Sequence, residues 1–357
     1  MSGGRKRSSG GKPHGAGEAS ASVTRGRERL RGATEQIRET VLDGSPAPKP
    51  QHFDVGAVVI CENADFRYRS WGDRASMNEY GLEIIRASLR LLVEANAAPS
   101  WLALPGGMLF GPLGVDGLAV EEEAEKVATS VLLRDSEVEG RLAKLTRAGL
   151  RGVLLGVDSI GDEREMSGED YEVPVRLAWS KRGMHVCALA RRCDWACYGV
   201  PPDAFLGSRY FSGAPSVYIA YCGEIQDTGI GGRLGSIRLG AGQRPEYVLD
   251  LSHLFRRPGM MKRRDYQVMS GIGRFVGRAC ANGSERLGAP VIISTVLVNR
   301  TPCTDPATDD RKAFWLAVQK KRGRHPQYLP PDRIVVGRSG DDGEIRMTIN
   351  LFGPVRA

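Results

Sequence analysis

Short apolar runs alternate along the chain with longer segments of helical periodicity, and this alternation constrains the fold more than any other feature. Runs typical of buried strands occupy residues 55–61, 101–104, 152–157, 217–222, 246–252 and 291–298. Residues 77–95 repeat apolar side chains at helical spacing, and residues 118–149 hold two further helical segments. Strands and helices in this order predict an α/β domain.

Two pairs of neighbouring strands are separated by turns short enough for β-hairpins. Residues 173–179 and 184–190 flank Arg182-Gly183, and residues 333–338 and 344–351 flank Asp341-Asp342-Gly343. Because the strands of a hairpin are antiparallel, the sheet is predicted to be mixed rather than purely parallel. One more helix is predicted at about 265–281.

The first 50 residues differ in composition from the rest of the chain. Gly, Ser, Ala and basic residues dominate them, which predicts a disordered N-terminal tail and linker. They hold ten Lys/Arg and five Asp/Glu, so they account for +5 of the net charge of +8. The folded domain, residues 51–357, is therefore nearly balanced in charge, and nucleic acid is not an expected partner. A basic, proline-rich insertion at 301–331 interrupts this domain and is predicted to hold a short helix, Arg311–Lys321.

The composition also bears on the compartment. No apolar run is long enough to span a bilayer, and the N-terminus lacks the apolar core of a signal peptide. We therefore expect a cytoplasmic protein with no membrane partner. Seven cysteines, an odd number at irregular spacing, fit free thiols better than a disulfide framework.

Two clusters partly resemble cofactor sites. His185, Cys187, Cys193 and Cys197 lie within thirteen residues, but their spacing is not that of paired Cys-x-x-Cys zinc ligands, so buried free thiols are the favoured interpretation. The glycine-rich residues 229–235 lack the Lys-Ser/Thr of a phosphate-binding loop. No metal or other cofactor is predicted.

Residues 217–225, Val-Tyr-Ile-Ala-Tyr-Cys-Gly-Glu-Ile, join an apolar strand to a turn that contains glycine. A junction of this kind can hold a thiol at the edge of a buried sheet, where a nucleophile is useful. Cysteine is also among the most buried residue types, so Cys222 can equally be an inert residue at the end of a core strand. The residue pattern leaves both interpretations open.

With its elements in this order, the chain resembles the carbon–nitrogen hydrolase (nitrilase) superfamily from about Phe53 to Phe352. The motifs that carry the resemblance are Leu102-Ala-Leu-Pro-Gly-Gly, the hairpin strand from Gly183 to Arg191, Cys222-Gly-Glu224, and Gly337-Arg-Ser339. The resemblance implies a four-layer α-β-β-α sandwich with mixed sheets. It also implies a homo-oligomer, because members commonly pair their sheets across a dimer.

The superfamily works with a Cys–Glu–Lys triad, in which cysteine forms a thioester, glutamate moves the proton and lysine stabilises the oxyanion. The resemblance assigns Cys222 to the nucleophile and Gly106 to the position of the glutamate. Arg191, or Arg192 if the register shifts by one, takes the position of the lysine and keeps its charge in a wider fork.

The missing base is the main departure from the triad, because glycine has no side chain to accept a proton. Glu224, two residues after the thiol, is the first candidate to replace it. Glu62, just after the first strand, and Asp203, in the loop before the nucleophile strand, are weaker candidates.

Two functions stay open at this point. The first is a thiol hydrolase or amide-bond transferase that acts on the C–N bond of a small-molecule amide or nitrile through a Cys222 thioester, with Arg191 and Glu224 as its other catalytic residues. The second is a catalytically degenerate domain that serves as a binding or regulatory module. In that case the 301–331 insertion, with Trp315 as an aromatic anchor, would bind a protein partner.

Overall fold

The computed structural model describes residues 50–63, 74–114, 119–159, 171–191, 209–221, 224–225, 239, 241–252, 283–285, 287–299, 316–318, 327–329, 331–338 and 345–353 of the 357-residue chain. The predicted N-terminal tail, the predicted helix at 265–281 and most of the 301–331 insertion lie outside these residues. Within them, no helix is long and apolar enough to cross a membrane.

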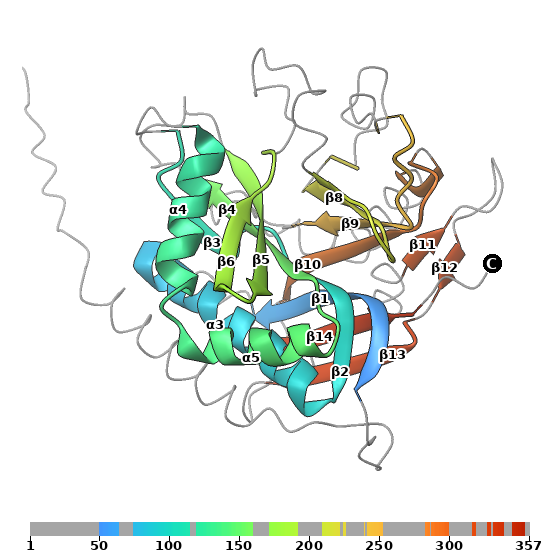
Figure 1. Cartoon of the computed structure of the whole chain (residues 1–357), viewed down its shortest axis with the longest axis horizontal. Coiled ribbons are helices and arrows are strands. Elements are labelled where there is room, and N and C mark those ends of the chain that lie inside the picture. Colours follow the sequence, from blue (N-terminus) through green and yellow to red (C-terminus); the bar gives the residue numbers. More distant parts are fainter. Residues whose placement is uncertain are drawn as a thin grey trace, which may run out of the picture.

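Three helices and fourteen strands make up the described fold (Figure 1). The helices are α3 (Arg74–Glu94), α4 (Val120–Leu132) and α5 (Ser136–Arg147). The strands are β1 (Gln51–Asn63), β2 (Ala97–Ala103), β3 (Leu109–Gly111), β4 (Gly152–Ser159), β5 (Glu172–Ser180), β6 (Gly183–Ala188), β7 (Tyr210–Phe211), β8 (Val217–Tyr221), β9 (Tyr247–Leu251), β10 (Val291–Asn299), β11 (Leu316–Val318), β12 (Gln327–Leu329), β13 (Arg333–Arg338) and β14 (Ile345–Phe352).

Strand β1 is the centre of the sheet and pairs with three other strands. The antiparallel strand β14 follows one edge of β1 along residues 55–62. On the other edge, β2 pairs in parallel with residues 51–57, and β10 pairs in parallel with residues 59–63. The sheet therefore divides at this edge into a first arm, β2-β4-β5-β6, and a second arm, β10-β9-β8-β7.

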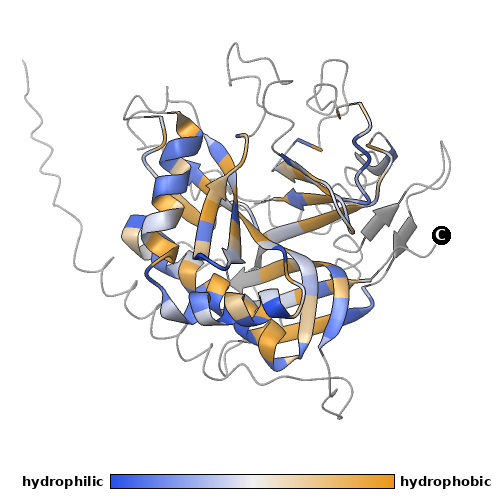
Figure 2. Ribbon diagram, viewed as in Figure 1, coloured by the Kyte–Doolittle hydropathy of each residue, from blue (hydrophilic) through white to orange (hydrophobic). Residues whose placement is uncertain are grey.

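The helices cover one face of the first arm. Alternate residues of β1, β2, β4 and β5 pack with the apolar sides of α3, α4 and α5 into one core, as Val153, Leu155 and Val157 of β4 illustrate. Figure 2 shows the strands of both arms to be largely apolar, while the helices carry polar as well as apolar residues. This pattern is typical of helices with one side packed on a sheet and the other facing water.

The other face of the first arm packs on the second arm. The remaining alternate residues of β1, β2 and β4 meet those of β8, β9 and β10, and we call this second core the inter-arm core. Its members are Val55, Ala57, Trp101, Ala103, Leu154, Leu189, Val217, Ile219, Tyr221, Tyr247, Leu249, Leu251, Ile292 and Phe352. The described fold thus has one helical layer and two β layers.

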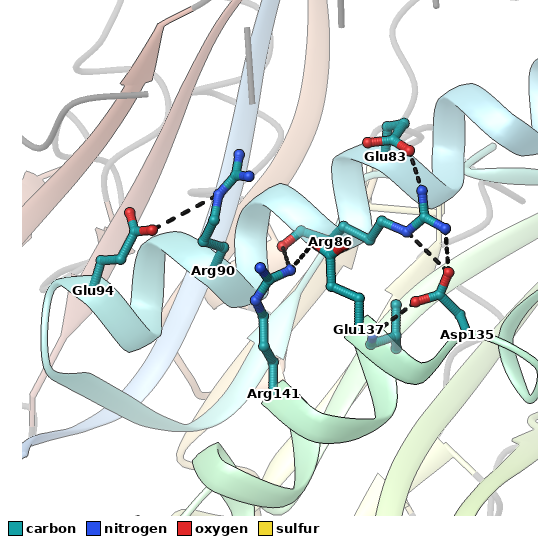
Figure 3. A network of polar contacts seen from close by, with 8 residues as sticks. Glu83, Arg86, Arg90, Glu94, Asp135, Glu137 and Arg141 are labelled. Atoms are coloured by element: carbon teal, nitrogen blue, oxygen red, sulfur yellow. Dashed lines mark hydrogen bonds and ion pairs between the residues drawn. The ribbon is translucent and has the colours of Figure 1, made fainter. Parts of the chain in front are cut away.

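A polar network joins α3 to α5 (Figure 3). Arg86 of α3 donates from Nε to Asp135 Oδ2 at 2.9 Å and also pairs with Glu83. Asp135 in turn caps α5, because its Oδ1 accepts the Val138 backbone N–H at 2.8 Å. Burial would raise the pKa of Asp135, but the hydrogen bonds from Arg86 and Val138 lower it below its usual value.

Most of the predicted elements are confirmed. The strands, the helices at 77–95 and 118–149, and both hairpins form at the predicted places in a mixed sheet. The first hairpin turns through Lys181 and Arg182, one residue before the predicted Arg182-Gly183, because Gly183 is already in β6 and pairs with Ser180; its φ is +102°.

The short helix predicted at 311–321 is wrong where the structure describes it. Leu316–Val318 forms strand β11, which pairs with β12 and, through Ala317, with Val291 of β10. A short apolar run has no strong preference between helix and strand, so backbone groups available at a neighbouring strand edge decide its structure.

Candidate active site

The carboxyl ends of several strands meet at one side of the two arms. Strands β1, β2, β4, β8, β9 and β10 all run parallel to one another through their successive pairings. Clefts beyond the carboxyl ends of parallel strands are the usual binding sites of α/β proteins. Here β2 leads to Gly106-Gly107, β4 ends in Asp158-Ser159, and β8 ends in Tyr221.

Tyr221 links these three strand ends. Its ring lies in the inter-arm core and is fully buried. Its hydroxyl donates to Asp158 Oδ1 at 2.6 Å and accepts the backbone N–H of Gly107 at 3.2 Å. Asp158 is itself only 5% exposed, so the hydrogen bond is made away from bulk water. The contact joins residues 63 positions apart in the chain.

The phenol of Tyr221 fills the space beside Gly106, the residue that the superfamily resemblance places at the glutamate position. A Cβ atom on Gly106 would lie 3.1 Å from both Cε1 and Oη of Tyr221 and 3.0 Å from the Leu251 carbonyl oxygen. A Cβ atom on Gly156 of β4 would lie only 1.7 Å from the same Oη. The tyrosine therefore excludes a side chain at Gly156 and leaves a tight fit for one at Gly106.

Glu172 places a second carboxyl group near Asp158. The two residues stand directly opposite each other in the antiparallel β4–β5 pair, so their side chains share one face of the sheet. Glu172 is 2% exposed. The end of β4 thus combines two buried carboxyl groups with the phenol of Tyr221.

Glu224 is held by a buried ion pair. Arg209 Nη1 lies 2.7 Å from both carboxylate oxygens of Glu224, and both side chains are buried. Glu224 Oε2 also accepts the Tyr221 backbone N–H at 2.9 Å, and the Glu224 N–H donates to the Tyr221 carbonyl at 3.0 Å. These bonds close a tight turn from residue 221 to residue 224. The carboxylate predicted to act as acid and base therefore faces donors that fix this turn.

Arg209 extends this support to the end of the first hairpin. Its Nε donates to the Ala190 carbonyl at 2.7 Å, and its Nη2 donates to the Arg191 carbonyl. One buried guanidinium thus connects residues 190–191 with the turn after β8. Neither Arg209 nor Asp158 was a candidate from the sequence, because an isolated Arg or Asp carries no local motif that indicates a distant partner.

Arg191 has its own partners on the helical side. Its backbone N–H donates to Glu121 Oε1 of α4 at 3.2 Å, and its Nε lies 4.0 Å from the same oxygen. The guanidinium also lies over the ring of Tyr171, 5.6 Å from the centroid. The structure brings the backbone of Arg191 to the Arg209–Glu224 pair, while its side chain contacts Glu121 and Tyr171.

The other predicted site residues are less fully described. Cys222, Arg192 and Asp203 lie outside the described residues, and so do Cys193 and Cys197. Glu62 belongs to β1, although its side chain is not among those described.

Two members of the His/Cys cluster, His185 and Cys187, are described, and both lie on β6. His185 and Cys187 are exposed on β6, so for Cys187 the prediction of a buried thiol is wrong. Partial desolvation and the carboxylate of Glu125 raise the pKa of the Cys187 thiol, and Arg176 offsets part of this rise. No group of three His, Cys, Asp or Glu side chains among the described residues could hold a metal ion.

The chain matches no protein-family model and no curated protein in sequence. Its structure is similar to a carbon-nitrogen hydrolase from Helicobacter pylori G27, with 11% identity, a TM-score of 0.36, and coverage of 82% of this chain and 89% of that one. It is also similar to a glutamine-dependent NAD(+) synthetase from Cytophaga hutchinsonii, with 11% identity and a TM-score of 0.30. The second match covers 83% of this chain and 42% of the synthetase.

Proposed function

We propose that the chain is a thiol-dependent hydrolase or amide-bond transferase that acts on a C–N bond through a Cys222 thioester. The observation that carries the proposal is the turn from Tyr221 to Glu224, which follows a fully buried strand at the carboxyl edge of the parallel strands. Cys222 and Gly223 are the two residues between the ends of this turn. Nucleophiles of α/β enzymes commonly occupy such strand-to-turn junctions.

Buried polar contacts hold both ends of the turn. Tyr221 anchors one end through Asp158 and Gly107, and Glu224 anchors the other end through Arg209. Buried, satisfied polar contacts of this kind hold a backbone in one geometry, which a nucleophile needs in order to meet its substrate. In this proposal Glu224 positions the turn.

The reaction would proceed in two displacements. The Cys222 sulfur attacks the carbonyl carbon of an amide, an S–C bond forms, and the C–N bond breaks as the nitrogen takes a proton and leaves as an amine. Water, or another amine in a transferase, then attacks the thioester and releases the acyl group. We propose Arg191 as the cation that stabilises the oxyanion. The substrate would be a small-molecule amide or nitrile.

The four-layer sandwich is part of the same proposal. Tyr218, Ala220, Val248, Asp250 and Ile293 are on the face of the second arm turned away from the inter-arm core, and all are fully buried. A second helical layer over this face would account for their burial. A cytoplasmic homo-oligomer is the form that we propose for the protein.

Covalent labelling tests the function. The full chain is incubated with p-nitrophenyl acetate as a general acyl donor and with a panel of small amides, and the adducts are located by peptide mass spectrometry. We expect an acetyl adduct on Cys222, amine release from at least one amide, and loss of both in Cys222→Ala. If Cys222 forms no adduct and reacts with iodoacetamide no faster than the other six thiols, the domain is a degenerate binding module.

A further inference from the structure

We infer that Arg151 and Arg176 form a binding site for a phosphate group at the end of the sheet opposite the candidate active site. Arg151 directly precedes β4, and Arg176 lies in β5 opposite Leu154. Strand β4 runs from this place to Asp158, which is about 20 Å away at roughly 3.3 Å per strand residue. The inference does not depend on the proposed function, because neither arginine belongs to the candidate active site.

Both guanidinium groups lie beside one indole ring. The Cζ atom of Arg151 is 5.0 Å from the centroid of Trp101, and the Cζ atom of Arg176 is 5.4 Å from it. Arg176 is also 5.3 Å from the ring centroid of Phe211, which packs on Trp101 at 4.8 Å. Trp101 is fully buried in the inter-arm core, so two positive charges meet where this core ends.

Backbone carbonyl groups hold both arginines in place. Arg151 donates from Nη1 to the Pro215 carbonyl at 3.2 Å and from Nη2 to the Ser212 carbonyl at 2.8 Å. Arg176 donates from Nη2 to the Arg151 carbonyl at 2.8 Å. The Nε of Arg151 and the Nη1 of Arg176 have no hydrogen-bond partner among the described residues. Donors that are already fixed lose little conformational freedom when an anion binds.

The site has two positive charges and no carboxylate. Other buried or partly buried arginines in the structure each lie next to a carboxylate; they are Arg86, Arg90, Arg141, Arg191 and Arg209. In the part of the chain that the structure describes, no carboxylate forms an ion pair with Arg151 or Arg176. Two neighbouring like charges raise the free energy of a partly buried site, and a bound anion would offset this cost.

The electrostatics of Arg176 agree with this geometry. Burial has the largest effect and lowers its pKa, Cys187 raises it, and the charge of Arg151 lowers it. A phosphate monoester is dianionic near neutral pH, so its charge matches that of two guanidinium groups. Its oxygens can accept hydrogen bonds from both planar forks, which suit phosphate better than a point charge does.

Cys187 provides a reporter for this site. It stands opposite Arg176 in the β5–β6 pair, so both side chains share one face of the sheet, and it is exposed. Burial and Glu125 raise the pKa of its thiol, while Arg176 opposes the rise. A bound phosphate would cancel the charge of Arg176 and raise this pKa further. Alkylation of Cys187 at a fixed pH should then slow down, because the thiolate is the reactive form.

The test is a titration of the full chain with inorganic phosphate at pH 7.5, in which KCl keeps the ionic strength constant. Calorimetry and thermal unfolding report binding, and peptide mass spectrometry follows iodoacetamide alkylation of Cys187. Methyl phosphate and acetate are titrated separately. The variants are Arg151→Gln, Arg176→Gln and Arg176→Lys. The matched control is Arg141→Gln, which removes a partly buried arginine that is paired with Glu137 on α5.

We expect one saturable phosphate site in the wild type and in Arg141→Gln. Each glutamine variant should bind phosphate at least roughly tenfold more weakly, as expected for the loss of a hydrogen bond to a charged group. Arg176→Lys keeps the charge without the fork, so its loss should be smaller. Phosphate should slow alkylation of Cys187 by roughly two- to tenfold in the wild type and have no effect on it in Arg176→Gln.

Several results would overturn the inference. Phosphate raises the thermal stability of many proteins through the solvent, so an equal rise in the wild type and in all variants would mean that no site exists. Equal affinity in the wild type and both glutamine variants would place the phosphate elsewhere. Acetate bound as tightly as phosphate would contradict a site for a dianion. Should Arg151→Gln fail to fold, the two Arg176 variants and the Cys187 rates still decide the question.

The methyl phosphate arm identifies the source of the phosphate group. Tighter binding of the monoester than of inorganic phosphate would assign the site to a phosphorylated small molecule, and the reverse order would assign it to the free ion. Either order supports the inference, whereas no binding of either compound would show that the two guanidinium groups only pack on the rings of Trp101 and Phe211.

Discussion

Tyr221 determines much of the local sequence around the candidate site. A side chain this large at the end of β8 needs the bare backbone of Gly156, and it leaves little room for a side chain at Gly106. Its hydroxyl group would be costly to bury without partners, and Asp158 and Gly107 supply them. At the scale of single residues, the site is thus a set of mutually dependent positions.

Replacing Gly156 by alanine tests this dependence. A Cβ atom 1.7 Å from Tyr221 Oη forces the phenol to move, so we expect Gly156→Ala to lower the free energy of unfolding by about 1–3 kcal/mol, the usual range for overpacking. Urea unfolding measures the change. The matched control is Gly140→Ala in α5, where nothing lies within 4 Å and alanine should stabilise the helix by about 0.5–1 kcal/mol. Equal effects of the two substitutions would contradict the packing described for Tyr221.

The Arg209–Glu224 pair gives a second prediction for single residues. Glu224→Gln keeps the shape of the side chain but leaves the buried Arg209 charge uncompensated, so we expect a loss of about 3–5 kcal/mol in the free energy of unfolding. The control is Glu137→Gln, which breaks the ion pair between Glu137 and Arg141. The Glu137 side chain is 41% exposed, so this substitution should change the free energy of unfolding by less than about 1 kcal/mol. A Glu224→Gln protein as stable as the wild type would show that the turn does not depend on this pair.

At the scale of the elements, α5 depends on a residue of another helix. Asp135 caps α5 through the Val138 N–H, and Arg86 of α3 holds the Asp135 carboxylate in place (Figure 3). Isolated helices of this length are marginal in water, so the cap and the packing against α3 supply much of its stability. The network therefore connects two of the three helices that cover the first arm.

The pH dependence of Asp135→Asn checks this connection. The pKa of Asp135 is lower in the folded protein than in the unfolded chain. Its carboxylate therefore stabilises the fold at pH values above its unfolded pKa, and this stabilisation is lost as the pH falls through its folded pKa. Asparagine can still cap the helix but loses the charge that Arg86 binds, so we expect Asp135→Asn to be less stable than the wild type by about 1–2 kcal/mol near pH 7. The difference should narrow only below about pH 4, in urea titrations at several pH values. A difference that is the same at every pH would mean that the charge of Asp135 is not involved.

At the scale of the whole molecule, the division of the sheet at β1 produces the two cores. Tyr247 of β9 connects two other strands. Its hydroxyl group donates a hydrogen bond to Asp54 of β1 at 2.8 Å and lies 2.6 Å from the carbonyl oxygen of Gly353, just after β14. Burial raises the pKa of Asp54, with smaller contributions from Glu246 and Asp332, while the bond from Tyr247 opposes the rise.

The raised pKa of Asp54 predicts that its effect on stability changes with pH in the opposite direction to that of Asp135. Its contribution to stability is fully present below the unfolded pKa of about 3.9 and is lost as the pH rises through the higher folded value. We expect Asp54→Asn to be the more stable protein near pH 7, by less than about 1 kcal/mol, and to lose this advantage in acid. Thermal unfolding across the pH range measures it. The interpretation fails if Asp54→Asn is the less stable protein at neutral pH and the more stable one in acid.

The order of helices and strands was predictable because apolar periodicity is a property of each segment. The local pattern of apolar side chains was enough to locate the strands β1, β8 and β10 and the helix α3. The segment Leu316–Val318 was not predictable in the same way, since its three residues adopt a strand by pairing with β12 and β10.

By itself, the sequence determined the mixed α/β character of this protein and the location of a strand-to-turn junction before Cys222. It also showed that position 106 is a glycine, which has no side chain to accept a proton. Only the tertiary structure decided which groups surround that junction: Asp158 reaches Tyr221 from 63 residues away, and Arg209 binds Glu224 across the turn. Such partners depend on how the two arms of the sheet face each other, and that arrangement is a property of the packed chain as a whole.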